Sequence, residues 1–183
     1  MSVSVGELSL TADDLREVVR FAVAAADEVL GLFEAACPAD RRPRAALAAA
    51  RAFADGAART HVLRMAAVDA HRAARETVDE AARCAAHAAG DAAAAAFLHP
   101  LARATQVGHI LRAAAYAAEA LGHRAGGDRA VVDAALRRTC RRATPALVDV
   151  LRRYPVPPPG TTAVSRTMAR LDAALRTGGP TVA

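Results

Sequence analysis

The sequence predicts an all-α protein, built as a compact bundle or a short helix-hairpin stack of seven or eight helices. Alanine, the residue with the highest intrinsic helix propensity, supplies 52 of the 183 residues. Phe and Tyr together supply only six, and Trp is absent. The core must therefore form by close helix contacts over small side chains. This length suits one folding unit, so we expect residues 1–183 to form a single all-α domain.

Capping residues and proline mark three helix starts in the N-terminal half. Thr11 followed by Asp14, and Thr77 followed by Glu80, match the capping box, which satisfies two backbone N–H groups at a helix start. Pro43 suits the first helical turn, where its missing N–H costs nothing. Together with the spacing of apolar residues, these signals predict helices over residues 11–36, 43–56, 58–75 and from 77 toward 98.

The helical pattern is interrupted at His99-Pro100. Proline lacks the helical N–H and clashes with the preceding turn. The sequence therefore allows either a break there or a kinked helix that continues to about residue 121. Asp128 and Thr144 then mark the starts of two further helices as capping residues.

A proline-rich segment precedes the last predicted helix. Residues 155–160 (PVPPPG) predict a rigid, extended connector. The helix after it has one apolar stripe, formed by Val164, Met168, Leu171 and Leu175. Such a stripe is typical of a helix that docks on the body of the protein. Residues 178–183 are predicted to form a frayed tail.

The composition excludes several classes of enzyme. The chain has no lysine, which P-loop ATPases need for the phosphates and Schiff-base enzymes need as the nucleophile. Serine occurs only at positions 2, 4, 9 and 165, without a GxSxG motif, and asparagine is absent. Serine-triad and Cys-His-Asn catalysis are therefore not expected. We predict that the protein is not an enzyme.

We expect a cytoplasmic protein that does not enter a membrane. Charged residues or His interrupt every long alanine run, so no stretch reaches the roughly 18 apolar residues of a membrane span. The first ten residues lack the basic and apolar regions of a signal peptide. Cys37, Cys84 and Cys140 are odd in number and widely spaced, which is typical of reduced thiols rather than disulfides or a zinc site.

Histidines give the third-ranked hypothesis, a histidine-lined, metal-binding bundle. None of them forms HxxxH, HExxH or the Glu-x-x-His motif of helical di-iron sites. We therefore predict no metal and no cofactor, and expect the imidazoles to form hydrogen bonds between helices or to loop carbonyls. The six residues are His61, His71, His87, His99, His109 and His123.

Charge is distributed unevenly along the chain. Residues 1–40 contain two Arg against eight acidic residues, whereas residues 41–183 contain 22 Arg against 11. Two Arg doublets repeat at i, i+4 and predict a positive ridge able to contact phosphates, which makes a basic nucleic-acid-associated protein the second hypothesis. No aromatic stacking partner or base-reading motif accompanies this ridge, which consists of Arg137, Arg138, Arg141 and Arg142.

Two segments carry a resemblance to a known family. RPRAALAAARAFADG at 42–56 and AAGDAAAAAFLHPLARATQVGHILRAAAYAAEAL at 88–121 resemble the immunity-protein-five-like family, small all-α proteins assigned to bacterial polymorphic-toxin systems. RMAAVDAHRAAR at 64–75 and VLRRYP at 150–155 extend the similarity over nearly the whole chain. Some relatives are labelled as an exonuclease subunit. This chain is short and lacks the P-loop, so we do not expect that label to apply to it.

The resemblance implies a protein that neutralises a toxin by covering it, through a protein–protein interface and without chemistry. The most specific match is His99-Pro100-Leu101-Ala102, followed by the polar residues up to His109. Candidate partner-binding residues are the polar residues of the matched segments, namely Arg44, Arg51, His71, His99, Gln106 and His109.

Overall fold

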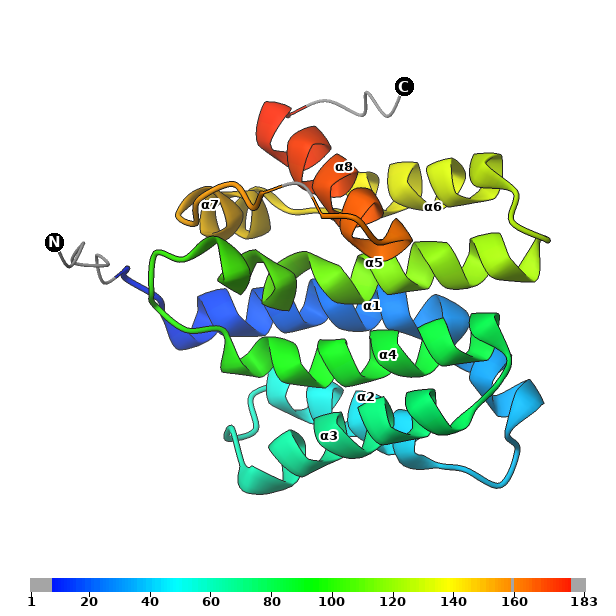
Figure 1. The fold of residues 1–183 in the computed structure, drawn as a ribbon. Helices are drawn as coiled ribbons and strands as arrows, with labels where there is room; N and C mark the ends of the chain where they lie inside the picture. The colour runs from blue at the N-terminus through cyan, green and yellow to red at the C-terminus, as the bar shows by residue number, and fades with distance from the viewer. Residues whose placement is uncertain (1–7, 159, 179–183) are drawn as a thin grey trace, which may run out of the picture.

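The computed structural model describes residues 8–158 and 160–178, which contain eight α-helices and no β-strand. The prediction of an all-α protein is confirmed (Figure 1). Two short 3-10 turns, η1 (Ala95–Phe97) and η2 (Ala104–Gln106), lie between the fourth and fifth helices. The helices are α1 (Ala12–Ala36), α2 (Arg42–Ala54), α3 (His61–Glu76), α4 (Glu80–Ala94), α5 (Val107–Arg124), α6 (Arg129–Arg142), α7 (Pro145–Arg152) and α8 (Ala163–Thr177).

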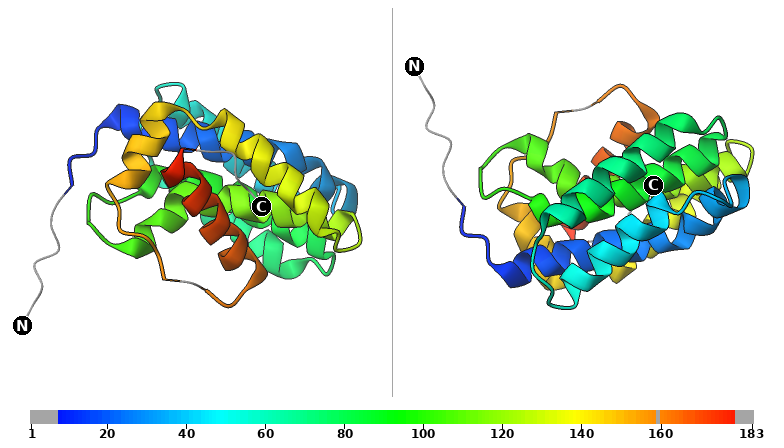
Figure 2. Two further views of the ribbon diagram at one scale, coloured as in Figure 1. Left: turned by 90° about the horizontal axis from the view of Figure 1, so that it is seen from above. Right: turned by 90° about the horizontal axis from the view of Figure 1, so that it is seen from below.

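α1 is the central helix of the fold. It contacts α2, α4, α5 and α7, and its buried face includes Val18, Phe21, Val29 and Phe33. α3, α4 and α5 lie side by side in one layer, in which α4 and α5 contact α1 and α3 contacts α2 (Figure 1). α6, α7 and α8 lie on the side of the molecule opposite α2 and α3 (Figures 1 and 2). In this arrangement α3 lies at one edge of the layer. α5 lies at the other edge, where it contacts α6 and α8.

α4 is almost completely enclosed. Eleven of its fifteen residues are buried, and eight of those are alanine. These small side chains let α1, α3 and α5 approach the α4 backbone closely. Its four other residues, Glu80, Arg83, His87 and Ala94, fall on one face at helical spacing. That face is the outer surface of the α3–α4–α5 layer.

The capping signals are confirmed at most helix starts. Thr11 and Asp14 form the predicted capping box of α1, and Asp128 and Thr144 cap α6 and α7. The prediction for α4 is wrong, because its N-cap is Asp79, whose carboxylate accepts a hydrogen bond from the Ala82 N–H at 2.7 Å. Thr77 instead ends α3 in extended conformation, with its buried hydroxyl beside Cys37.

At Pro100 the chain breaks rather than kinks. η1 ends at Phe97 and α5 begins only at Val107. The connection is held at both backbone groups of His99, because its N–H donates to the Gln106 side-chain oxygen at 2.9 Å and its carbonyl accepts from the Tyr154 hydroxyl at 2.8 Å. The loop is therefore fixed by η2, just before α5, on one side and by Tyr154, two residues after α7, on the other.

The last helix docks on the body, as predicted. Thr167 of α8 donates its hydroxyl to Glu119, a buried residue of α5. Arg129, the first residue of α6, contacts both oxygens of the same carboxylate at 2.9 and 3.0 Å. Residue 159 of the predicted connector and residues 179–183 of the predicted frayed tail lie outside the described residues.

Candidate functional site

A group of polar side chains lies between α3, α4 and α5, where alanine otherwise predominates. His71 comes from α3, His87 and Asp91 come from α4 at i, i+4, and Arg112 and Tyr116 come from α5 at the same spacing. Residues four apart on a helix share one face, so each pair points toward the same inter-helix contact. We call these five residues the polar cluster.

The side chains of the polar cluster contact one another directly. The Nδ1 atoms of His71 and His87 are 3.0 Å apart, so one imidazole donates and the other accepts. The His87 ring stacks on Tyr116 with centroids 4.7 Å apart. Arg112 Nε donates to Asp91 Oδ1 at 3.0 Å, and His71 Nε2 lies 3.7 Å from the same oxygen. The buried Asp91 Oδ2 has no hydrogen-bonding partner among the described residues.

Gly90 makes room for the His71 ring. A Cβ atom at this position would lie 2.8 to 2.9 Å from three atoms of the imidazole, closer than van der Waals contact permits. Any other residue would force the ring to move away from α4. Glycine costs about 1 kcal/mol relative to alanine inside a helix. The glycine at position 90 therefore lowers the stability of α4 but allows His71 to approach the helix closely.

Burial and neighbouring arginines keep the two imidazoles neutral at pH 7. Burial is the largest cause that lowers the pKa of His71, and Arg112 and Arg75 lower it further. Burial also lowers the pKa of His87 to about 4, with contributions from His71 and Arg75. Burial raises the pKa of the Asp91 carboxyl, and Arg112 opposes that shift. The two imidazoles of the polar cluster are thus uncharged at pH 7.

These shifts predict that the protein loses stability between pH 7 and pH 5. The pKa of His87 is about 4 in the folded state, against an ordinary value of 6.5. Between these values the unfolded chain binds a proton that the folded chain does not, so the free energy of unfolding falls as the pH falls. Allowing for solvent screening of a partly exposed group, we expect a loss of about 1–2 kcal/mol.

Urea unfolding of the wild type, His87→Gln and His123→Gln at half-unit pH steps checks this expectation. His123 is an exposed histidine at the end of α5 and serves as the matched control. The free energy of unfolding should fall less steeply with falling pH in His87→Gln than in the wild type. In His123→Gln it should fall as steeply as in the wild type. Carboxylates with lowered pKa values, such as Asp14 and Asp40, contribute mainly below pH 4. The raised pKa of Asp91 acts in the opposite direction, and Asp91 is retained in all three proteins. Parallel curves for the wild type and His87→Gln would contradict the prediction.

The six predicted partner-binding residues occupy three separate places. His71 belongs to the polar cluster, and His109 lies one turn before Arg112, with its Nδ1 atom 3.0 Å from the Ala94 carbonyl oxygen. His99 and Gln106 hold the loop after η1, where His99 is exposed and Gln106 accepts its backbone N–H. The two arginines of α2 form ion pairs with α1, Arg44 with Glu34 and Arg51 with Asp27.

Sequence analysis missed three members of the polar cluster. Asp91, Arg112 and Tyr116 were not among the candidates, and His87 entered only as one histidine of six. The available signal was the i, i+4 spacing of His87 with Asp91 and of Arg112 with Tyr116 inside alanine-rich helices. Polar residues that interrupt an otherwise buried helix need partners, so each such pair predicts a contact with a neighbouring helix.

α3 presents an apolar stripe to solvent. Val62, Met65 and Val68, spaced three apart, are 72%, 39% and 42% exposed. They account for three of the five large apolar side chains that are exposed in the described part of the chain, and a fourth, Val78, lies two residues after the end of α3. We call Val62, Met65 and Val68 the α3 stripe. It borders the polar cluster, because His71 follows Val68 by one turn.

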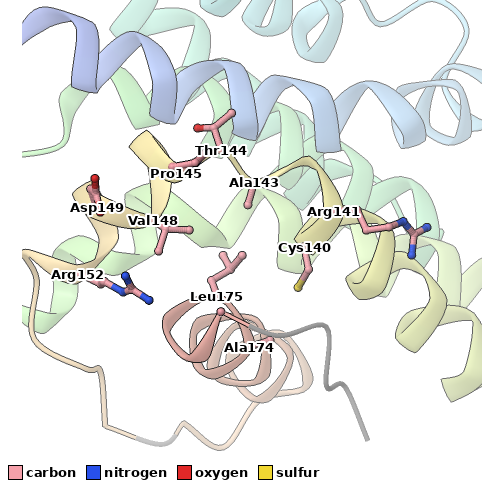
Figure 3. A pocket seen from close by; sticks show the side chains of 11 residues that line it. Cys140, Arg141, Ala143, Thr144, Pro145, Val148, Asp149, Arg152, Ala174 and Leu175 are labelled. Carbon is pink, nitrogen blue, oxygen red and sulfur yellow. The ribbon is translucent and has the colours of Figure 1, made fainter.

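The arginine ridge on α6 is partly neutralised. Arg138 and Arg142 both pair with Glu28 of α1. Arg141 instead lines a cavity of about 360 Å³ between α6, α7 and α8, where Val148 and Leu175 point toward one another (Figure 3). For Arg137 the described structure records no ion pair. The four arginines therefore do not act as one uniform positive surface.

Three further observations concern the remaining hypotheses. Within residues 8–158 and 160–178, no three His, Cys, Asp or Glu side chains are arranged to hold a metal ion. Over the same residues, no helix combines the length and apolar character of a bilayer span. Cys37, Cys84 and Cys140 are free thiols, and burial raises the pKa of Cys84 to about 12.

Comparison with known proteins identifies the family. Neither the curated proteins nor the solved structures contain a match to this chain. The family described as Imm-5 like putative immunity protein matches residues 8–146, which include α1 to α6, the polar cluster and the α3 stripe. The resemblance noted in the sequence is therefore confirmed, and the chain belongs to the Imm-5 like immunity protein family.

Proposed function

We propose that this protein is a cytoplasmic immunity protein that neutralises a toxin by binding it, without catalysis. Family membership supports this class of function. The observation that carries the binding mechanism is the exposed α3 stripe beside the polar cluster. Contiguous exposed apolar side chains rimmed by polar groups are characteristic of protein–protein interaction sites.

The α3 stripe has the composition of an interface centre. Burying the exposed part of three aliphatic side chains contributes about 1 kcal/mol each. Arg64 and Arg75 flank the stripe, and in the described residues neither forms an ion pair with a carboxylate. Arginine is enriched in protein interfaces and at their energetic centres. A specific complex covers about 800 Å² on each partner, so the interface would extend beyond α3 onto neighbouring elements.

Binding without chemistry agrees with the side chains present near this surface. The polar cluster contains no Ser, Cys or Lys, the side chains that most often act as nucleophiles. Cys84 is the thiol of α4, and a pKa of about 12 keeps it protonated and unreactive at pH 7. Of the six candidate residues, we propose His71, His99 and His109 as contacts. His99 is exposed, and His71 and His109 each use only Nδ1 in their recorded hydrogen bonds, whereas Arg44, Arg51 and Gln106 are held by partners within the chain.

Capture from the native host, followed by a growth assay, tests this proposal. Tagged wild type and a Val62→Ser, Met65→Ser, Val68→Ser triple variant are compared, with a Thr161→Ser variant as the matched surface control. The recovered protein is then expressed in a heterologous host. We expect it to stop growth alone and to permit growth when the wild type is present, with weaker protection by the triple variant. A recovered protein that is harmless alone would contradict the immunity function.

A further inference from the structure

We propose that the outer face of the α3–α4–α5 layer receives an acidic segment of the protein partner, with one carboxylate placed beside His71 and His87 between Arg75 and Arg112. This inference rests on the proposed function and specifies the chemistry of its partner. The face comprises the α3 stripe, the polar cluster, and the arginines Arg64, Arg75 and Arg83. We refer to it as the docking face.

The charges on the docking face favour an anion. On α3, Asp69 lies beside the stripe and is paired with Arg72 at 3.1 Å. Four further arginines, Arg64, Arg75, Arg83 and Arg112, face two carboxylates, Asp91 and the adjoining Glu80. Of those, Asp91 is 2% exposed and held by Arg112, and Glu80 is held by Arg83 at 2.6 Å. Among the described residues Arg75 has no recorded hydrogen-bonding partner, yet its charge acts on both imidazoles. The positive potential at the histidine pair is therefore not cancelled within the chain.

The histidine pair can strengthen that potential by taking up one proton from solvent. Protonated on both ring nitrogens, His71 would donate Nδ1–H to His87 and direct Nε2–H toward Asp91 Oδ1, 3.7 Å away. Asp91 is buried and fixed by Arg112, so it is placed to stabilise the imidazolium. The groups that face this pair are Arg75 from α3, Arg83 and Asp91 from α4, and Arg112 and Tyr116 from α5.

The α3 stripe favours a protein segment over a nucleic acid as the anion. A phosphate backbone would gain little from contact with the exposed apolar side chains of Val62, Met65 and Val68. An acidic protein segment with apolar neighbours would contact both the stripe and the histidine pair. Nucleic-acid binding would also gain from a free aromatic ring, but Tyr116 is already stacked on His87. Apolar and cationic surfaces lie next to each other here, within one turn of α3.

Isothermal titration calorimetry with the toxin recovered in the capture experiment tests the inference. The variants are Arg75→Glu and His71→Gln, and their matched controls are Arg141→Glu on α6 and His123→Gln. Melting curves establish that all five proteins are folded. We expect Arg75→Glu to weaken binding about 30-fold or more, because it places a negative charge beside the docked carboxylate. We expect His71→Gln to weaken binding about 10-fold, because it removes the proposed site of proton uptake. The controls should bind within about 3-fold of the wild type.

The pH dependence separates docking of a carboxylate at the histidine pair from a general charge effect. Wild-type affinity should rise as the pH falls from 8 to 6, by up to about tenfold per unit for one proton taken up, and His71→Gln should lose this dependence. Titrations in phosphate and in Tris at one pH should differ in apparent enthalpy. The buffer supplies the proton that the complex takes up, and the two buffers have different ionisation enthalpies. Gly90→Ala, which displaces the His71 ring, should behave like His71→Gln.

Each alternative outcome is informative. Toxin binding that is equal in wild type, Arg75→Glu and His71→Gln would overturn this inference and leave the immunity function intact. Absence of a toxin among the recovered proteins would overturn both. Recovery of nucleic acid, with binding that weakens steeply with salt and is impaired in Arg141→Glu, would replace the docking face by the α6 ridge.

Discussion

Replacing Arg129 by methionine is expected to lower the free energy of unfolding by about 3 kcal/mol, since it leaves a buried carboxylate without its cation. Glu119 is 3% exposed, and Arg129 contacts both of its oxygens. In the variant only the Thr167 hydroxyl remains as a recorded side-chain partner in the described residues. For a protein of this size, the loss should lower Tm by about 6–12 °C.

Urea unfolding monitored by circular dichroism measures the effect of Arg129→Met. Arg124→Met, at the exposed end of α5, is the matched control and should change stability by less than about 1 kcal/mol. The double variant Glu119→Gln, Arg129→Met removes the stranded charge and should recover part of the loss. If the Arg129→Met protein were as stable as Arg124→Met, water would be able to replace Arg129 as the partner of the Glu119 carboxylate, and the prediction would be wrong. Because Thr167 belongs to α8, proteolysis within residues 163–177 should also accelerate in Arg129→Met.

Replacing Tyr154 by alanine is expected to cost about 3–5 kcal/mol, the usual range for removing a buried aromatic side chain. Tyr154 is 1% exposed and belongs to the main core cluster. It lies beyond residues 8–146, the segment that matches the family, yet its hydroxyl holds the His99 carbonyl within that segment. The variant should therefore weaken both the core and the loop between η1 and α5.

Tyr154→Phe separates these two effects. Phenylalanine retains the buried ring and loses only the hydrogen bond to His99, for an expected cost of about 1 kcal/mol. Hydrogen exchange should then report faster opening of residues 98–106 in Tyr154→Phe, with little change in α1. Equal exchange in wild type and Tyr154→Phe would show that the Gln106 contact alone fixes the loop.

The sequence predicts the helices well because their signals are local. Thr11 with Asp14, Asp128 and Thr144 each act within three residues, and each caps the helix expected. Thr77 misleads because Asp79, two residues later, offers a competing cap. The break at Pro100 depends on distant contacts, above all that between Tyr154 and His99, so local signals leave it open. Propensity alone does not include such tertiary contacts.

The polar cluster is harder to predict because its members come from three helices. His71, His87 and Arg112 are separated by 16 and 25 positions, and nothing in their spacing specifies that they meet. Their contact depends on which faces of α3, α4 and α5 turn toward each other, which alanine-rich helices define poorly by hydrophobicity alone. Gly90 is similarly uninformative in the sequence, and its role follows only from the ring packed against it.

The position of α1 at the centre of the fold affects the protein during translation. α1 ends at Ala36, but α4 and α5, which cover its apolar face, begin only at Glu80 and Val107. Ribosomes add about 5–20 residues per second, so the apolar face of α1 stays uncovered for several seconds until α4 and α5 have been synthesised. During that interval Phe21 and Phe33 are available to chaperones and to other nascent chains. A translational pause before the end of α5 should therefore increase aggregation of the growing chain more than a pause within α8.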